Sequence, residues 1–324
     1  MIAIAAIAIA AGCASALMFA SIISGALISL VLFYLAPLPL MVAALGWGPL
    51  SAAMGGIAAA STLGLLFGMP YGIAYTLTVA LPAWWLGHLV MLGRPVANTA
   101  HAGNGAAPPA PAMEWYPSGR LLLWVAVFAV ITTMSALLTL GTDPADIAAS
   151  MKRFFLRVLG PSGTMATADL DRVIDAFVAI APSGAALVAM LALTINLWLA
   201  AKITATSGRL NRSWPDIRST ALPPMTLVAL CVAIALCFTG GLLALIAQVA
   251  TSALLMAYAL TGFAVLHTLT LASTSRAIWL GLTYAIMFIF FWPVLAMIVL
   301  GLADAIFGLR ERFMRTRPPP LPAA

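Results

Sequence analysis

Long apolar runs without any charged residue dominate the chain. The first run extends from the N-terminus to Gly93, and Arg94 is the first charged side chain. Each run exceeds the roughly 20 residues that a helix needs to cross the hydrocarbon core of a bilayer. None has the short alternating pattern of barrel strands, and open sheet edges cannot be satisfied in lipid. The pattern therefore predicts an all-α fold, a polytopic bundle of transmembrane helices. The other runs are 121–142, 176–201, 219–275 and 277–303.

Proline, glycine and polar interruptions divide these runs into about eight spans, with a range of seven to nine. We expect residues 36–46 to add a broken or re-entrant piece. The membrane domain then covers residues 1–308 as a single unit, and residues 309–324 form a basic, proline-rich C-terminal tail. The expected spans lie near 11–35, 47–68, 70–92, 120–141, 177–202, 222–242, 244–271 and 277–303.

Two loops interrupt the predicted bundle. Residues 93–119 contain a Gly, Ala and Pro mixture that is typical of a flexible linker. Residues 142–172 instead contain an amphipathic helix, which we expect either in the membrane interface or packed on the bundle. Its apolar stripe is Ile147, Met151, Phe154, Phe155 and Val158, flanked by Lys152, Arg153 and Arg157.

Composition limits the classes of function. With 64% hydrophobic and 7% charged residues, the chain has too little polar surface for a water-soluble globule. The net charge of +6 is confined to loops and the tail, which indicates contact with anionic lipid headgroups and no nucleic-acid partner. With eight spans, eight Lys and Arg residues fall on one side of the membrane and seven on the other, so the count does not fix an orientation, and we expect both termini in the cytoplasm.

The segment from Tyr34 to Ile57 is apolar but holds three prolines and four glycines. Small residues at steps of four let a neighbouring helix backbone come close. The prolines at Pro37 and Pro39 are expected to end the first span and to free backbone carbonyls that protein must cover. The segment is either a tight helix seam with a proline-rich turn or a discontinuous helix near a solute site. The predicted helix-packing residues are Gly48, Ala52, Gly56, Ala60, Gly64 and Gly68.

Polar residues inside the predicted spans are candidates for a binding site, because polar groups are costly in lipid. Most lie on one face of the span 244–271, where they either bind a solute or clasp a neighbouring helix. His267 near its end and Asn196 on an earlier span face the same choice. The candidate substrate-binding residues are Asn196, Gln248, Thr251, Tyr258 and His267.

Asp304 and Arg310 close the last predicted span. On a continuous helix they would lie about 240° apart, so they are not an i,i+4 pair. We expect Asp304 to be an interfacial anchor or to form an ion pair with another helix. No phosphate-binding loop, zinc motif or pair of carboxylates within a span is present, so the sequence favours no enzyme, no cofactor and no metal site.

Four stretches resemble the YybS-like family of bacterial membrane proteins. They are P-L-P-L before a glycine-rich span, N-L-W-L-A-A-K-I at 196–203, Y-A-L-T-G-F-A-V-L-H at 258–267 and G-L-A-D-A-I-F-G-L-R at 301–310. Thr261 departs from the glutamine expected before the glycine. The resemblance implies a multi-pass location in the bacterial inner membrane. The N-terminal pattern is also similar to the substrate-binding membrane subunits of energy-coupling-factor transporters, which dock through Ala-x-x-x-Ala faces such as Ala6 to Ala10.

Two functions follow as hypotheses. The first is binding or transport of a small solute, between the glycine-rich span and the polar face of the span 244–271. The second is a membrane scaffold for envelope biogenesis that acts through helix contacts and basic loops. Expected partners are membrane lipids, a small-molecule solute, and a membrane protein or a second copy of the chain.

Overall fold

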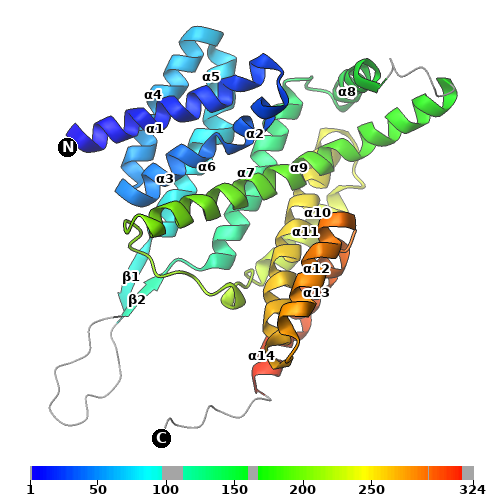
Figure 1. The fold of residues 1–324 in the computed structure, drawn as a ribbon. Coiled ribbons are helices and arrows are strands. Elements are labelled where there is room, and N and C mark those ends of the chain that lie inside the picture. The colour runs from blue at the N-terminus through cyan, green and yellow to red at the C-terminus, as the bar shows by residue number, and fades with distance from the viewer. Residues whose placement is uncertain (1, 97–111, 160–166, 291, 316–324) are drawn as a thin grey trace, which may run out of the picture. The chain divides into compact units, whose positions relative to one another are not determined.

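The computed structural model describes residues 2–96, 112–159, 167–290 and 292–315. These residues form two compact units (Figure 1). Unit 1 comprises residues 1–117 and 191–214, and unit 2 comprises residues 118–190 and 215–324. Within these described ranges, seven helical segments are long and apolar enough to span a membrane, and three shorter helices are also apolar. The prediction of an all-α membrane protein is confirmed.

Unit 1 contains the N-terminal helices and the last part of a long helix, α9 (Thr167–Thr206), which begins in unit 2. A two-stranded antiparallel hairpin follows the N-terminal helices and pairs Gly93 with Trp115. This hairpin borders the predicted linker, whose residues 97–111 lie outside the described part. The elements are α1 (Ile2–Ala20), η1 (Ser21–Ser24), α2 (Leu27–Leu35), α3 (Pro37–Trp47), α4 (Pro49–Phe67), α5 (Met69–Tyr75), the π-helical η2 (Thr76–Ala80), α6 (Leu81–Met91), β1 (Gly93–Val96) and β2 (Ala112–Trp115).

Prolines begin helices in unit 1 and do not break them. Proline occupies the first or second position of α3, α4, α5 and α6, where its missing N–H has no helical partner in any case. Gly48, with φ of 96°, lies between α3 and α4 in a conformation that side chains rarely adopt. The expected broken or re-entrant piece at 36–46 corresponds to α3, which is separated from α2 at Ala36 and together with it is long and apolar enough to span from Leu27 to Trp47. The expected first span at 11–35 is likewise divided between α1 and α2.

Two carbonyl groups next to the α2–α3 junction are covered by side chains from other helices. The Ser15 hydroxyl donates to the carbonyl of Ala36 over 2.7 Å, and the Tyr75 hydroxyl donates to Ser15 over 2.8 Å. The Asn196 amide donates to the carbonyl of Tyr34 over 2.8 Å. Protein therefore provides the cover that lipid cannot give to polar backbone.

The small residues of α4 form a tight seam, but only part of it was predicted. A Cβ at Gly55 would collide with the Ala8 carbonyl, and a Cβ at Gly56 would lie 3.0 Å from the Ala80 Cβ. Gly64 approaches Gly72 of α5, whereas Gly48 and Gly68 lie in the turns that bound α4. Ala52, Gly56 and Ala60 also line an open apolar groove of about 460 Å³ beside η2 and α6.

Unit 2 contains the C-terminal helices and the first part of α9. Its core packs α7 against α8 and α11, with Ile147 and Met151 buried beside Leu137 and Val249. The amphipathic helix α8 thus packs on the bundle through the first part of its apolar stripe, while Phe154, further along the same stripe, is 59% exposed. The elements are α7 (Ser118–Leu138), α8 (Pro144–Leu159), α9, η4 (Ile217–Ser219), α10 (Met225–Leu236), α11 (Gly241–Leu269), η5 (Thr270–Ala272), α12 (Arg276–Phe290), α13 (Val294–Phe307) and α14 (Leu309–Arg315).

The expected single span at 277–303 is wrong. It consists of two antiparallel helices, α12 and α13, which lie beside α11 (Figure 1). Pro293 precedes α13 and separates the two, because a proline N-terminal to a helix favours a chain break there. Since α12 reverses the chain, α13 runs in the same direction as α11. The C-terminal tail therefore begins at the same end of unit 2 as the segment after α11.

Glycines allow α11 and α13 to touch backbone to backbone. A Cβ at Gly262 would collide with the Met297 carbonyl, and a Cβ at Gly301 would collide with the Tyr258 carbonyl. This reciprocal contact is the small-x-x-x-small geometry that replaces hydrophobic drive inside lipid. It brings the C-terminal ends of both helices together.

Candidate functional site

The predicted site residues on α11 do not share one environment. Gln248 is exposed on the surface of unit 2, whereas Thr251 is half-buried, with its hydroxyl 3.7 Å from the Cys237 sulfur. Tyr258 is 1% exposed and packs among Leu230 and Leu254. The three residues lie within about 80° of one another around α11, but their exposure falls along the helix from Gln248 to Tyr258.

His267 and Asn196 each have hydrogen-bond partners within their own unit. The His267 Nε2 atom lies 2.8 Å from the Tyr284 hydroxyl of α12, and the Tyr284 ring stacks on Phe263. Asn196 belongs to unit 1, where its amide donates to the carbonyls of Tyr34 and Ala192. Both residues join helices, and in both cases the sequence indicated the polar position but not the partner.

A turn at Gly308 creates the ion pair between Asp304 and Arg310. Gly308 adopts the left-handed conformation with φ of 63°, which ends α13 and redirects the chain into α14. Arg310 thereby returns to Asp304, and its guanidinium lies 2.7 Å from the carboxylate. The Arg310 and Asp304 side chains are only 14% and 10% exposed. Their angular separation on a continuous helix is irrelevant because the helix does not continue.

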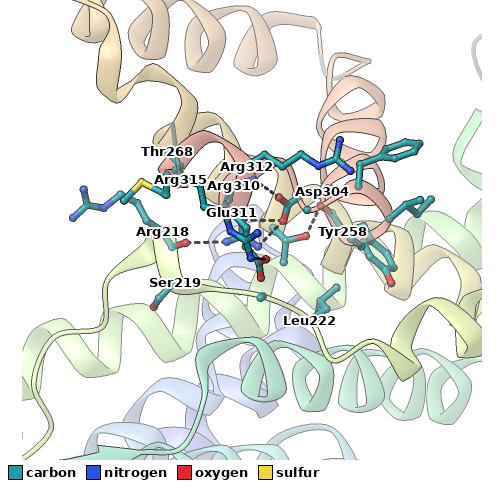
Figure 2. A pocket seen from close by; sticks show the side chains of 18 of the residues that line it. Arg218, Ser219, Leu222, Tyr258, Thr268, Asp304, Arg310, Glu311, Arg312 and Arg315 are labelled. Atoms are coloured by element: carbon teal, nitrogen blue, oxygen red, sulfur yellow. Dashed lines mark hydrogen bonds and ion pairs between the residues drawn. The ribbon is translucent and has the colours of Figure 1, made fainter. Parts of the chain in front are cut away.

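Arg310 also holds the segment before α10. Its Nη1 atom donates to the carbonyl of Arg218 over 2.8 Å (Figure 2). The same atom donates to the carbonyl of Thr220, also over 2.8 Å. The guanidinium fork thus joins α13, α14 and the loop at η4 in one arrangement, which a lysine could not reproduce. At the other side of this loop, the hydroxyls of Ser118 and Thr220 lie 3.1 Å apart.

An open cavity of about 970 Å³ surrounds this arrangement. Tyr258 and Thr261 of α11 line it together with residues of the loop at η4. Apolar side chains such as Leu222 and Phe307 line it together with charged groups. The charged lining residues are Asp216, Arg218, Asp304, Arg310, Glu311, Arg312 and Arg315.

Most of these charged side chains form ion pairs with one another, but Arg312 does not. Asp216 and Arg218 form an ion pair at 2.8 Å. Hydrogen bonds from Arg218 lower the pKa of the Asp216 carboxyl, and the hydrogen bond to Asp216 raises the pKa of the Arg218 guanidinium. The exposed Arg315 and Glu311 lie 3.8 Å apart. Among the described residues, no acidic side chain lies within 4 Å of Arg312. Figure 2 shows Arg312 and Arg315 extending outward in different directions from α14.

Sequence reasoning missed most of the cavity. It assigned residues 309–315 to a tail, although they form α14, and it assigned no role to the segment around Asp216. The close spacing of charges in L-R-E-R-F-M-R after a glycine is the signal that indicates a short interfacial helix. Within the described residues, no group of three His, Cys, Asp or Glu side chains is placed to hold a metal ion.

Comparison with known proteins gives a family and no activity. No curated protein and no solved structure matches the chain. One family model matches residues 13–305, which is most of the chain and includes helices of both units. The chain belongs to the family of predicted membrane proteins described as DUF2232.

Proposed function

We propose that this multi-span membrane protein binds a small anionic solute in the cavity at the C-terminal ends of α11 and α13. The observation that carries the proposal is the cavity itself, which is open, about 970 Å³ in volume and edged by arginines. This volume lies in the range of small-molecule sites, about 300–1,000 Å³. Of the predicted substrate-binding residues, Tyr258 lines this cavity, and the predicted anchor residues Asp304 and Arg310 line it as well.

Charge supports an anion as the ligand. Arg310 and Arg218 are already paired with Asp304 and Asp216, so their charges are neutralised within the protein. Arg312 and Arg315 remain at the edge with a weak acidic partner at most. Guanidinium groups present planar donors that match the oxygen atoms of carboxylate and phosphate groups. Transport of the bound solute is the further step of this proposal.

The first experiment measures the melting temperature of the purified protein in mild detergent. The probes are inorganic phosphate, glycerol phosphate and citrate at increasing concentrations. We expect at least one probe to raise the melting temperature, because a ligand at a hundredfold excess over its Kd stabilises by about 2.7 kcal/mol. The double variant Arg312→Gln/Arg315→Gln is expected to bind that probe about tenfold or more weakly, since a hydrogen bond to a charged group contributes about 1.5–3 kcal/mol.

A matched control comes from α8. The double variant Arg153→Gln/Arg157→Gln also removes two exposed arginines from a short amphipathic helix of unit 2. It is expected to bind the probe like the unmodified protein. Equal weakening in both variants, or no stabilisation by any probe, would contradict solute binding at this cavity.

Scaffolding is the second candidate, and the hydrogen bonds of the predicted site residues favour it. Asn196 donates to two backbone carbonyls, and Tyr258 is buried among apolar side chains. Such residues clasp helices instead of presenting polar groups to a solute. Native mass spectrometry separates the two functions, because a retained non-lipid molecule supports solute binding, whereas a bound partner protein without one supports the scaffold.

A further inference from the structure

The cations of unit 2 are distributed unequally between its two ends. One end is the cavity end, where α7 begins, α11 and α13 finish and α14 lies. The Ser118–Thr220 contact at 3.1 Å and the Arg310–Thr220 hydrogen bond at 2.8 Å join these segments. Six arginines and three acidic residues of the described part lie there. The arginines are Arg120, Arg218, Arg276, Arg310, Arg312 and Arg315, and the acidic residues are Asp216, Asp304 and Glu311.

The opposite end of unit 2 carries α8 and the beginning of α9. Lys152 of α8 forms ion pairs with Asp175 at 2.7 Å and with Asp171 at 3.6 Å. Four cations and five acidic residues of the described part lie at this end, so negative charge is in slight excess. They are Lys152, Arg153, Arg157 and Arg172, with Asp143, Asp146, Asp169, Asp171 and Asp175.

In unit 1, taken by itself, the cations are distributed even more unequally between the two ends. Its described cations are Arg94, Lys202, Arg209 and Arg212, and all lie at the end where α6 and α9 finish. Arg212 is buried and donates to the carbonyls of Val90 and Tyr116. Arg209 lies 4.6 Å from the ring centre of Trp47, and tryptophan is typical of the membrane–water interface. No charged residue precedes Arg94, so the turns at Gly25 and Gly68 carry none.

We infer that the basic end of each unit faces the cytoplasm, where it contacts the anionic headgroups of the inner leaflet. Lys and Arg near span ends are retained on the cytoplasmic side, and that leaflet carries the negative surface potential that attracts them. The count of eight against seven in the sequence was balanced only because residues 277–303 were treated as one span. Because α12 and α13 reverse the chain, the tail arginines lie on the same side as Arg218 and Arg276. The Lys and Arg residues are then no longer divided almost equally between the two sides of the membrane.

This orientation makes the cavity accessible from the cytoplasm. It does not depend on solute binding, because it follows from where the cations lie and not from what the cavity holds. The partner that the basic ends of the units contact is a bilayer with anionic headgroups.

Cysteine labelling tests the orientation. Cys13, Cys231 and Cys237 are first replaced by alanine, and single cysteines are then introduced at exposed positions. Ser207→Cys and Ser275→Cys report on the basic ends of units 1 and 2. Ala149→Cys on α8 and Thr239→Cys between α10 and α11 report on the opposite end of unit 2.

The reagent is a membrane-impermeant maleimide, applied to spheroplasts of a bacterial host before and after lysis. We expect Ala149→Cys and Thr239→Cys to react in intact spheroplasts, and Ser207→Cys and Ser275→Cys to react only after lysis. Reaction of either serine-site variant in intact spheroplasts overturns the inference. If a cysteine does not react even after lysis, a cysteine is introduced at a neighbouring position instead, at Thr142 for Ala149 or at Thr274 for Ser275. Labelling is then measured at both ends of unit 2.

Discussion

Single glycines decide how closely the helices of unit 2 approach. Gly262 and Gly301 lie in the contact between α11 and α13, and each meets a carbonyl of the other helix. Gly281 of α12, by contrast, has no atom of another helix within 4 Å of the position that a Cβ would take. All three are glycines in apolar helices, and the sequence alone does not distinguish them. Their consequences for stability are therefore a property of the packing.

We expect Gly301→Ala to lower the melting temperature in detergent by several degrees. The new methyl group meets the Tyr258 carbonyl, and overpacking of this kind costs typically about 1–3 kcal/mol. Gly281→Ala is the control, and it should leave the melting temperature unchanged or raise it, because alanine favours a helix by about 1 kcal/mol over glycine. If both variants melt alike, the close contact of α11 and α13 is not formed in the protein.

At the scale of elements, Arg310 joins the consecutive helices α13 and α14 to the loop at η4, which is distant in sequence. It pairs with Asp304 and donates to the loop before α10. A continuous helix through residue 310 would keep the two charges apart, as the sequence predicts. The turn at Gly308 makes the pair, and glycine is the residue that adopts this conformation at low cost. The sequence therefore contained the cause, but only the folded turn shows the result.

A double-mutant cycle measures this junction. We expect Asp304→Asn and Arg310→Gln each to destabilise unit 2, by about 3 kcal/mol where an uncompensated charge stays buried. The double variant should lose less than the two single losses together, since the partners depend on each other. Thermal unfolding in detergent gives the values.

Arg94→Gln serves as the control for that cycle. It breaks the ion pair with Glu114, whose side chains are 77% and 53% exposed, and such pairs contribute at most about 1 kcal/mol. Strictly additive losses at Asp304 and Arg310 would show that the two side chains do not interact.

At the scale of the whole molecule, the pairing of α12 with α13 sets the side on which the tail emerges. The sequence-based spans put the segment after α11 and the tail on opposite sides of the membrane. The structure puts both at the cavity end of unit 2, whether α12 and α13 cross fully or enter and return. The two arrangements differ in a single, measurable way.

Reporter fusions distinguish these arrangements. Green fluorescent protein fused after Thr239, after Ser275 or after Arg315 fluoresces only where its fusion point lies in the cytoplasm. We expect the fusions after Ser275 and Arg315 to behave alike, and the fusion after Thr239 to give the opposite signal. Opposite signals from Ser275 and Arg315 would restore a single span at 277–303. Alkaline phosphatase fusions at the same points should give the inverse pattern.

The sequence by itself determined that this is a helical, multi-span membrane protein, because hydrophobicity and run length are local properties that lipid imposes on every segment. It also located the polar residues Asn196, Tyr258 and Asp304, since such residues are rare in apolar runs. Only the tertiary structure decided that Asn196 covers a carbonyl, that Gly301 is a contact, and that 277–303 is two helices. Those facts depend on which backbone another helix presents, and a pattern along one chain does not contain that information.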